Sequence, residues 1–184
     1  MTSFANPAGN AAAAAPAYVR ALLDLLGPRP PLEVLPELVP WVESRVRGVP
    51  DELLRRPEAP GKWSVVEVLQ HLADTEMVYG VRGRLVLSED RPLIVGFDQD
   101  RWASLFRYRD APPELALGQL AALREANLAV WRAAGPAELA RVGLHSERGE
   151  ESLDLMLRMM AAHDLVHRRQ IERILAGASA GARA

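Results

Sequence analysis

The stretch Trp63 to Glu76, which reads WSVVEVLQHLADTE, decides the fold class of this chain. Ser64 precedes Glu67 by three residues, a spacing that predicts a capping box in which each side chain satisfies a free amide of the first turn. Apolar residues then recur at three- and four-residue intervals, which predicts one long helix over Val65 to Ser88. His71 lies about two turns after the start of that helix.

Helical spacing also continues on both sides of this stretch, and no convincing β-strand pattern interrupts it. An earlier helix is expected from about Tyr18 or Leu32 to Arg47, broken by a proline cluster. Ser152 is expected to cap the last helix and Gly177 to end it. The later helices are expected over residues 99–108, 113–134 and 153–175. Together these elements predict an all-α, antiparallel four-helix bundle with short additional helices.

Length and composition favour one globular domain. The chain has 184 residues, 49% of them hydrophobic, with a formal net charge of −2, which is typical of a soluble protein with a single core. Residues 1–16 and 177–184 are rich in alanine and glycine, so we expect a flexible arm and a flexible tail around a bundle domain over 17–176. No apolar run is long enough to span a membrane and no secretory leader is recognisable, so we expect a cytoplasmic protein.

Several functions are excluded by what the sequence lacks. There is no cysteine, so any metal must be held by His, Asp or Glu, and no cysteine nucleophile exists. The motifs of serine hydrolases, P-loop nucleotide hydrolases and dinucleotide-binding folds are absent. The near-neutral charge gives no reason to expect nucleic acid or an anionic membrane as a partner.

The last helix carries two histidines on its apolar face. Residues four apart on a helix have Cβ atoms about 5–6 Å apart, so the imidazoles of His163 and His167 can converge on one metal ion. The alternative is that each ring is neutral and hydrogen-bonded within the core, or that the helix is rotated and one ring is solvated. The apolar stripe comprises Leu153, Met156, Met160, His163, His167, Ile171 and Ile174.

A third histidine strengthens the metal interpretation. In a bundle, side chains from facing helices meet in the core, so His71 can join His163 and His167 in a three-histidine site. The remaining coordination positions would stay open to water or substrate, as in a reactive metal centre. Asp74 and Glu76 flank His71 and Asp164 adjoins His163, and one of these carboxylates could orient an imidazole or accept a proton. Their alternative role is a solvated helix face or an ion pair.

Three other residues have weaker claims on function. His145 lies in a predicted loop, where it could be a fourth ligand, a substrate contact or an ordinary surface residue. Trp102 follows a segment of aromatic and acidic residues and could form a wall of a binding cleft or pack on the bundle. Trp63 precedes the capping serine, where packing on the first turn is the favoured role.

Three segments of the sequence, taken in order, resemble the DinB/YfiT-like superfamily, and the likeness covers about residues 32–175. The segments are WSVVEVLQHLADTE at 63–76, FDQDRWA at 97–103 and HDLVHRRQI at 163–171. The resemblance implies a four-helix bundle, often a homodimer, with a divalent metal held by His71, His163 and His167. Characterised members of the family include thiol transferases and isomerases that use a low-molecular-weight thiol, and others are described as metal-dependent hydrolases.

These observations lead to one leading hypothesis and two alternatives. The leading hypothesis is a cytoplasmic enzyme, with a role in detoxification, in which a divalent metal, zinc or nickel before manganese or iron, promotes transfer of a low-molecular-weight thiol cosubstrate to a small electrophile. The first alternative is metal-dependent hydrolysis by an activated water. The second is a non-catalytic, stress-responsive module for metal binding or dimerisation, in which a fourth protein ligand such as His145 would close the site. The specific catalytic residues are not predicted.

Overall fold

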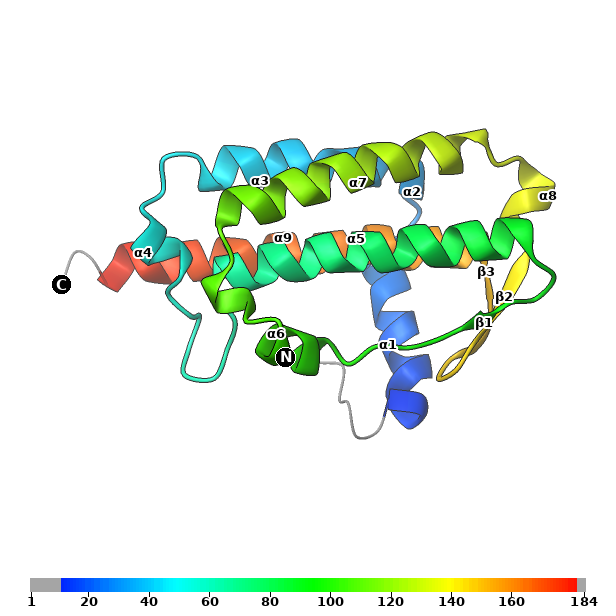
Figure 1. Ribbon diagram of the computed structural model, residues 1–184, viewed down its shortest axis with the longest axis horizontal. Helices are drawn as coiled ribbons and strands as arrows, with labels where there is room; N and C mark the ends of the chain where they lie inside the picture. Colours follow the sequence, from blue (N-terminus) through cyan, green and yellow to red (C-terminus); the bar gives the residue numbers. More distant parts are fainter. Residues whose placement is uncertain (1–10, 182–184) are drawn as a thin grey trace.

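The computed structural model describes residues 11–181, and its helices and strands are shown in Figure 1. Helices make up most of the chain, and three short strands form a small sheet at one end. In chain order the elements are α1 (Ala11–Leu26), α2 (Pro31–Val34), the 3-10 helix η1 (Leu35–Glu37), α3 (Leu38–Val46), α4 (Asp51–Leu54), α5 (Val65–Ser88), β1 (Leu93–Ile94), α6 (Gln99–Leu105), the 3-10 helix η2 (Tyr108–Asp110), α7 (Pro113–Ala133), α8 (Pro136–Leu139), β2 (Val142–His145), β3 (Gly149–Ser152) and α9 (Leu153–Gly181).

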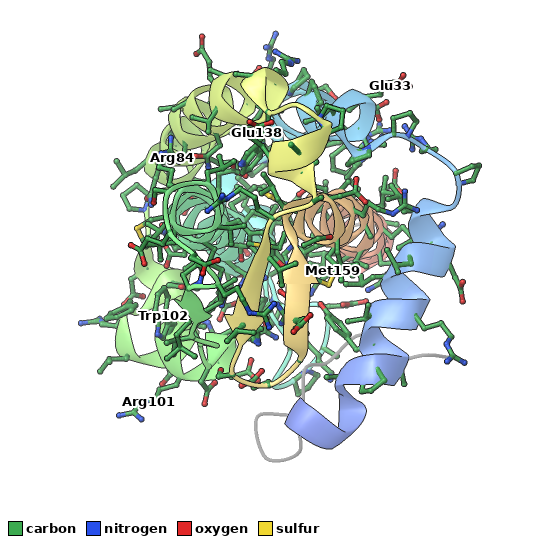
Figure 2. The ribbon with its side chains drawn as sticks, turned by 90° about the vertical axis from the view of Figure 1, so that its right-hand side faces the viewer. Glu33, Arg84, Arg101, Trp102, Glu138 and Met159 are labelled. Atoms are coloured by element: carbon green, nitrogen blue, oxygen red, sulfur yellow. The ribbon has the colours of Figure 1, made fainter. Side chains whose placement is uncertain are left out.

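The predicted four-helix bundle is confirmed. Its long elements are the α2–α3 run, α5, α7 and α9, which lie along the long axis of the molecule in Figure 1 and are seen end-on in Figure 2. Helix α1 crosses the bundle and packs on α9. None of the helices in the described part of the chain is both long and apolar enough to cross a membrane.

The helix directions differ from a simple antiparallel arrangement, because α5 and α7 run the same way. Gln70 near the start of α5 contacts Gln119 near the start of α7, while Glu76 further along α5 contacts Asn127 further along α7. The chain can do this because residues 89–112, which include β1 and α6, carry it back along the length of the bundle (Figure 1). Bundles with such long crossover connections bring parallel helices side by side.

The structure contains a small sheet where the sequence showed no convincing strand. Strand β1 pairs in parallel with β2, placing Leu93 opposite Leu144 and Ile94 opposite His145. Strand β2 pairs antiparallel with β3 through a tight turn over residues 146–148, and Gly149, which begins β3, has a positive φ of 80°. The expectation of no strand was wrong because each strand is only two to four residues long, too short to display an alternating pattern.

The ends of the helical region also differ from the boundaries expected from the sequence. Helix α1 begins at Ala11, within the stretch expected to be a flexible arm, while residues 1–10 lie outside the described chain. The hydroxyl of Ser152 accepts a hydrogen bond from the Leu155 amide at 3.1 Å, as the predicted cap requires. Gly177 does not end the last helix, which continues to Gly181.

A polar layer divides the core into two apolar clusters. One cluster lies toward the sheet and includes Leu35, Trp131 and Met160, and the other lies toward α4 and includes Leu69 and Ile171. Between them α5, α7 and α9 contribute buried polar side chains, and the candidates His71, Glu76, Asp164 and His167 belong to this layer. The buried polar residues of the layer are His71, Asp74, Thr75, Glu76, Arg124, Asn127, Asp164 and His167.

Close packing of the sheet against α5 leads to a stability prediction. A methyl group on Gly143 would overlap the end of the Ile94 side chain and lie 3.0 Å from a methyl carbon of Val86. We therefore expect Gly143→Ala to lower the free energy of unfolding by about 1–3 kcal/mol. Gly118→Ala is the matched control: it lies in exposed helix with open space around it, and should raise stability by up to about 1 kcal/mol. Urea unfolding of both variants, followed by circular dichroism, tests this; a Gly143→Ala protein as stable as the original would contradict it.

Candidate metal site

Three histidine rings from two helices meet in the polar layer. The Nε2 atom of His163 lies 3.0 Å from Nε2 of His71 and 3.1 Å from Nε2 of His167. His71 on α5 is 1% exposed and His167 on α9 is 8% exposed, whereas His163 is only partly buried. The structure thus brings together the three histidines singled out in the sequence, and the partly buried His163 leaves the cluster in reach of solvent.

The geometry of these nitrogens fits a divalent cation. Two nitrogens that each lie about 2.0–2.1 Å from one ion are about 2.9–3.4 Å apart at coordination angles between roughly 90° and 110°. The two measured separations fall in that range. A neutral imidazole has one N–H and one lone pair, so three rings that turn the same nitrogen toward one point can direct their lone pairs at a single ion. Within the described residues this is the group of His, Asp and Glu side chains that could hold a metal.

Burial keeps all three rings neutral, as metal binding requires. Desolvation lowers the pKa of His71 and of His163 well below the ordinary value, and the neighbouring histidines add to both shifts. The pKa of His167 is lowered to about 4, again mainly by burial, although its hydrogen bond to Gln170 acts in the opposite direction. At neutral pH the lone pairs of the cluster are therefore available to a cation.

Gln170 sets the orientation of one ring. Its side-chain oxygen lies 2.8 Å from Nδ1 of His167, and because an amide oxygen only accepts, Nδ1 carries the proton. The lone pair of the neutral ring is then on Nε2, the atom that faces the other histidines. Fixing a tautomer through the distal nitrogen is the usual role of residues behind a metal ligand.

Two residues beside the cluster were not recognised as part of the site. Trp63, expected only to pack on the first turn of its helix, places its ring 4.9 Å from the ring of His71. Thr75 lies one turn after His71 on α5, is 5% exposed, and has a hydroxyl with no hydrogen-bond partner. Spacing of four residues from His71 could have pointed to Thr75, whereas the contact of Trp63 depends on how the preceding loop enters the helix.

Arg124 connects the two carboxylates that were considered as partners of the histidines. Its guanidinium, 3% exposed, lies 2.8 Å from Glu76 and 2.7 Å from Asp164, and it also donates to the backbone carbonyl of Leu35. Asn127 donates a further hydrogen bond to Glu76. Glu76 and Asp164 therefore serve an ion network that ties α5, α7 and α9 together directly behind the histidines.

The two remaining candidates lie away from the three rings. Trp102 is on α6, at the side of the bundle (Figures 1 and 2), and its ring contacts Phe97 and Phe106. His145 is the last residue of β2 and is buried in the sheet end of the molecule. It does not belong to the metal-binding group found in the described chain, so the possibility of a fourth ligand at His145 is not supported, because β2 holds it at the far end of α5.

Burial of neutral histidines makes the metal-free protein sensitive to acid. An unfolded histidine titrates near pH 6.5, whereas His167 in the fold titrates at about 4 and His71 and His163 also titrate lower than usual. Below about pH 6.5 the unfolded chain binds protons that the folded chain does not, so the free energy of unfolding is fully present above that pH and falls as the pH is lowered toward 4.

Each buried histidine contributes a slope of about 1.4 kcal/mol per pH unit within this window. Urea unfolding of metal-free protein at pH 7.5, 6 and 5 measures the slope. A His163→Phe variant, which has one titrating ring fewer, should show a shallower dependence. Stability that is constant or that rises on acidification would contradict the buried neutral cluster.

A helical bundle with a crossover connection and three converging histidines defines a class of helical proteins with a candidate metal site, and comparison with known proteins identifies the family of this chain. The family model of the DinB superfamily matches residues 42–171. The chain belongs to this superfamily. This confirms the family resemblance seen in the sequence.

Two relatives of this chain share one description, that of a metal-dependent hydrolase. A protein of Oceanobacillus iheyensis called a "putative metal-dependent hydrolase" is 30% identical over 136 residues, covering 74% of this chain and 77% of that protein. YfiT of Bacillus subtilis, with the same description, is 34% identical over 94 residues, or 51% of each chain. The solved structure of YfiT superposes with a TM-score of 0.74 at 27% identity, covering 78% of this chain and 83% of that one; it is described as "a probable metal-dependent hydrolase with an unusual four-helix bundle topology".

Proposed function

We propose that this protein is a metal-dependent hydrolase in which His71, His163 and His167 hold the metal. The observation that carries the proposal is the number of ligands: in the described chain, three histidine nitrogens converge without a fourth His, Asp or Glu. A divalent ion bound by three protein ligands keeps positions for water and substrate, and it lowers the pKa of the bound water and polarises a carbonyl or phosphoryl oxygen. The descriptions of the relatives support the same reaction class.

The chain's own residues would support this chemistry by holding the ligands in place. Gln170 keeps the proton of His167 on Nδ1, and the ring of Trp63 covers one side of His71 and excludes water from it. Arg124 holds the two helices that carry the ligands in register through Glu76 and Asp164. A site held by packed helices keeps its geometry better than one built on loops.

Transfer of a low-molecular-weight thiol is a second candidate, favoured by the state of the nearby carboxylates. Glu76 and Asp164 are bound to Arg124, and Asp74 accepts a hydrogen bond from the Tyr108 hydroxyl. Among the described residues, no free carboxylate therefore lies in the histidine cluster to deprotonate water. A thiol has a pKa near 8.5 rather than the 15.7 of water, so it depends less on such a base. With no cysteine in the chain, the thiol would be a cosubstrate.

One experiment separates the two reactions. Purified protein is analysed for bound metals, reconstituted with zinc, nickel, manganese or iron(II), and assayed with a nitrophenyl ester and, separately, with 1-chloro-2,4-dinitrobenzene plus glutathione, bacillithiol or mycothiol. Metal-dependent ester cleavage without thiol supports hydrolysis, and saturable thiol-dependent consumption of the electrophile supports transfer. Metal binding without either activity would favour the non-catalytic module.

Small-molecule substrates, homodimerisation and a cytoplasmic location stay predictions. Size-exclusion chromatography with light scattering tests the predicted homodimer.

A further inference from the structure

A second buried polar cluster lies at the sheet end of the bundle. Arg82 of α5 is 5% exposed, yet its one hydrogen bond in the described chain is donated to the backbone carbonyl of Val95 at 2.6 Å. It stacks near the rings of Tyr79 and Phe97, at 5.4 and 5.9 Å from their centres, and no carboxylate of the described residues lies within ion-pair distance of it. A buried guanidinium with donors to spare is unusual, because burying a charge is unfavourable unless it is paired.

His145 supplies a second donor without an acceptor. The backbone amide of Glu147 donates to Nδ1 of His145 at 3.1 Å, so the proton of the neutral ring is on Nε2. That Nε2 atom is buried and has no hydrogen-bond partner, while the residue as a whole is 4% exposed. A buried N–H without an acceptor is costly in a folded protein, so this N–H is suited to donate to a ligand.

Arg82 and His145 meet at strand β1, because the carbonyl that Arg82 contacts belongs to Val95, the residue after Ile94, and Ile94 pairs with His145. We propose that Arg82 and the Nε2–H of His145 bind an oxyanion, either a carboxylate or a phosphate, carried by the substrate. Arg148 lies close enough to influence both groups, but it is itself paired with Glu151 at 3.0 Å, and Glu147 and Glu151 act on Arg82 with the opposite sign, so the donors left for an anion are those of Arg82 and His145. Charge-assisted hydrogen bonds from an arginine to an oxyanion are among the strongest that a protein makes.

The charge environment of His145 supports this assignment. Its pKa is lowered to about 3, first by burial and then by the positive charges of Arg148 and Arg82. The ring therefore stays neutral and keeps its Nε2–H as a donor over the whole range in which the protein is expected to work. The positive charges of Arg148 and Arg82 that oppose protonation of the ring favour an anion beside it, and the carboxylates of Glu147 and Glu151 offset part of that effect.

The position of the cluster relates it to the three histidines, and this part of the inference rests on the proposed function. His71, Thr75, Tyr79 and Arg82 follow one another at spacings of four, four and three residues, so they share one face of α5. Eleven residues of helix span about 16 Å, which sets the scale of a substrate whose anionic group is bound at Arg82 while its reacting group lies at the histidines. The unpartnered hydroxyl of Thr75 lies between the two.

Anion binding can be measured without any metal or activity. Acetate and inorganic phosphate are titrated separately into isotope-labelled protein, and the His145 Nε2–H and Arg82 Nε–H signals are followed by NMR. We expect saturable shifts with at least one anion, and which anion binds more tightly distinguishes a carboxylate from a phosphate ligand. The His163→Ala protein should bind the anion with unchanged affinity, and Arg82→Met should weaken binding at least about tenfold.

A matched control is Arg141→Met, which removes another arginine that donates to backbone carbonyls at the same end of the bundle and should change the affinity less than about twofold. If Arg82→Met does not fold, as judged by circular dichroism, His145→Phe is the second test and should also weaken binding. Unchanged affinity in Arg82→Met would show that this arginine only fastens the 92–98 segment, and absence of saturable binding of either anion would also overturn the proposal. Loss of binding in His163→Ala would place the anion at the histidines and overturn it too, whereas an inactive enzyme that still binds the anion at Arg82 would refute only the proposed function.

Discussion

The His163→Ala protein is expected to lose more than about a hundredfold in metal affinity, because removal of a ligand should exceed the roughly 10–100-fold effect of removing a residue behind one. His163 is the central ring of the three, because its Nε2 atom lies within 3.1 Å of the Nε2 atoms of both other rings. Its removal leaves a metal ion with only the two nitrogens of His71 and His167. Elemental analysis after dialysis against a weak chelator, together with calorimetric titration of zinc and nickel, measures the effect.

His145→Ala is the control for this experiment. It also removes a buried histidine, but from the sheet end of the molecule, so its metal content should match that of the original protein. The far-ultraviolet circular dichroism of His163→Ala should be unchanged, since the two apolar clusters hold the helices together. A His163→Ala protein that keeps stoichiometric metal would refute the assignment of the site.

Replacing Arg124 by methionine is expected to lower the free energy of unfolding by about 3–5 kcal/mol at pH 7.5, since it leaves buried carboxylates without their counterion. Glu76 is fully buried and Asp164 is 2% exposed. Burial already raises the pKa of both carboxyls against the opposing effect of Arg124. Without the arginine they can avoid the buried charge only by taking up protons, so the loss should be smaller at pH 5 than at pH 7.5.

Two further variants test whether the unpaired buried carboxylates cause this loss of stability. Arg173→Met breaks an exposed pair with Glu58 and should change stability by no more than about 0.5 kcal/mol. Adding Glu76→Gln and Asp164→Asn to Arg124→Met removes the stranded charges and should recover part of the loss. Urea unfolding at pH 7.5 and pH 5 measures the free energy of unfolding of each variant. An Arg124→Met protein as stable as Arg173→Met would contradict the role of the network.

Local signals explain what could be predicted from the sequence. Helix α5 has the predicted bounds because its start is encoded within four residues: the Ser64 amide donates to the Glu67 carboxylate at 2.8 Å and the Glu67 amide donates back to the Ser64 hydroxyl. The stripe of α9 likewise depends only on helical spacing. The convergence of the three histidines followed from such stripes together with the family resemblance.

The features that escaped prediction depend on contacts between distant parts of the chain. Arg124 stands among ordinary helical residues, and nothing near it in sequence shows that it is buried between Glu76 and Asp164. The pairing of β1 with β2 joins residues about fifty positions apart. The parallel course of α5 and α7 depends on the path of the 89–112 connection, and local periodicity carries no information on such a path.

The spacing of the three histidines along the chain also has a consequence for biosynthesis. His71 and His163 are separated by 92 positions, and the second of them lies in the final helix. At the usual rate of about 5–20 residues per second, a ribosome adds the second and third rings several seconds after the first. A nascent or truncated chain that ends before α9 therefore carries only one of the three, and the complete cluster arises only in a chain whose last helix has docked.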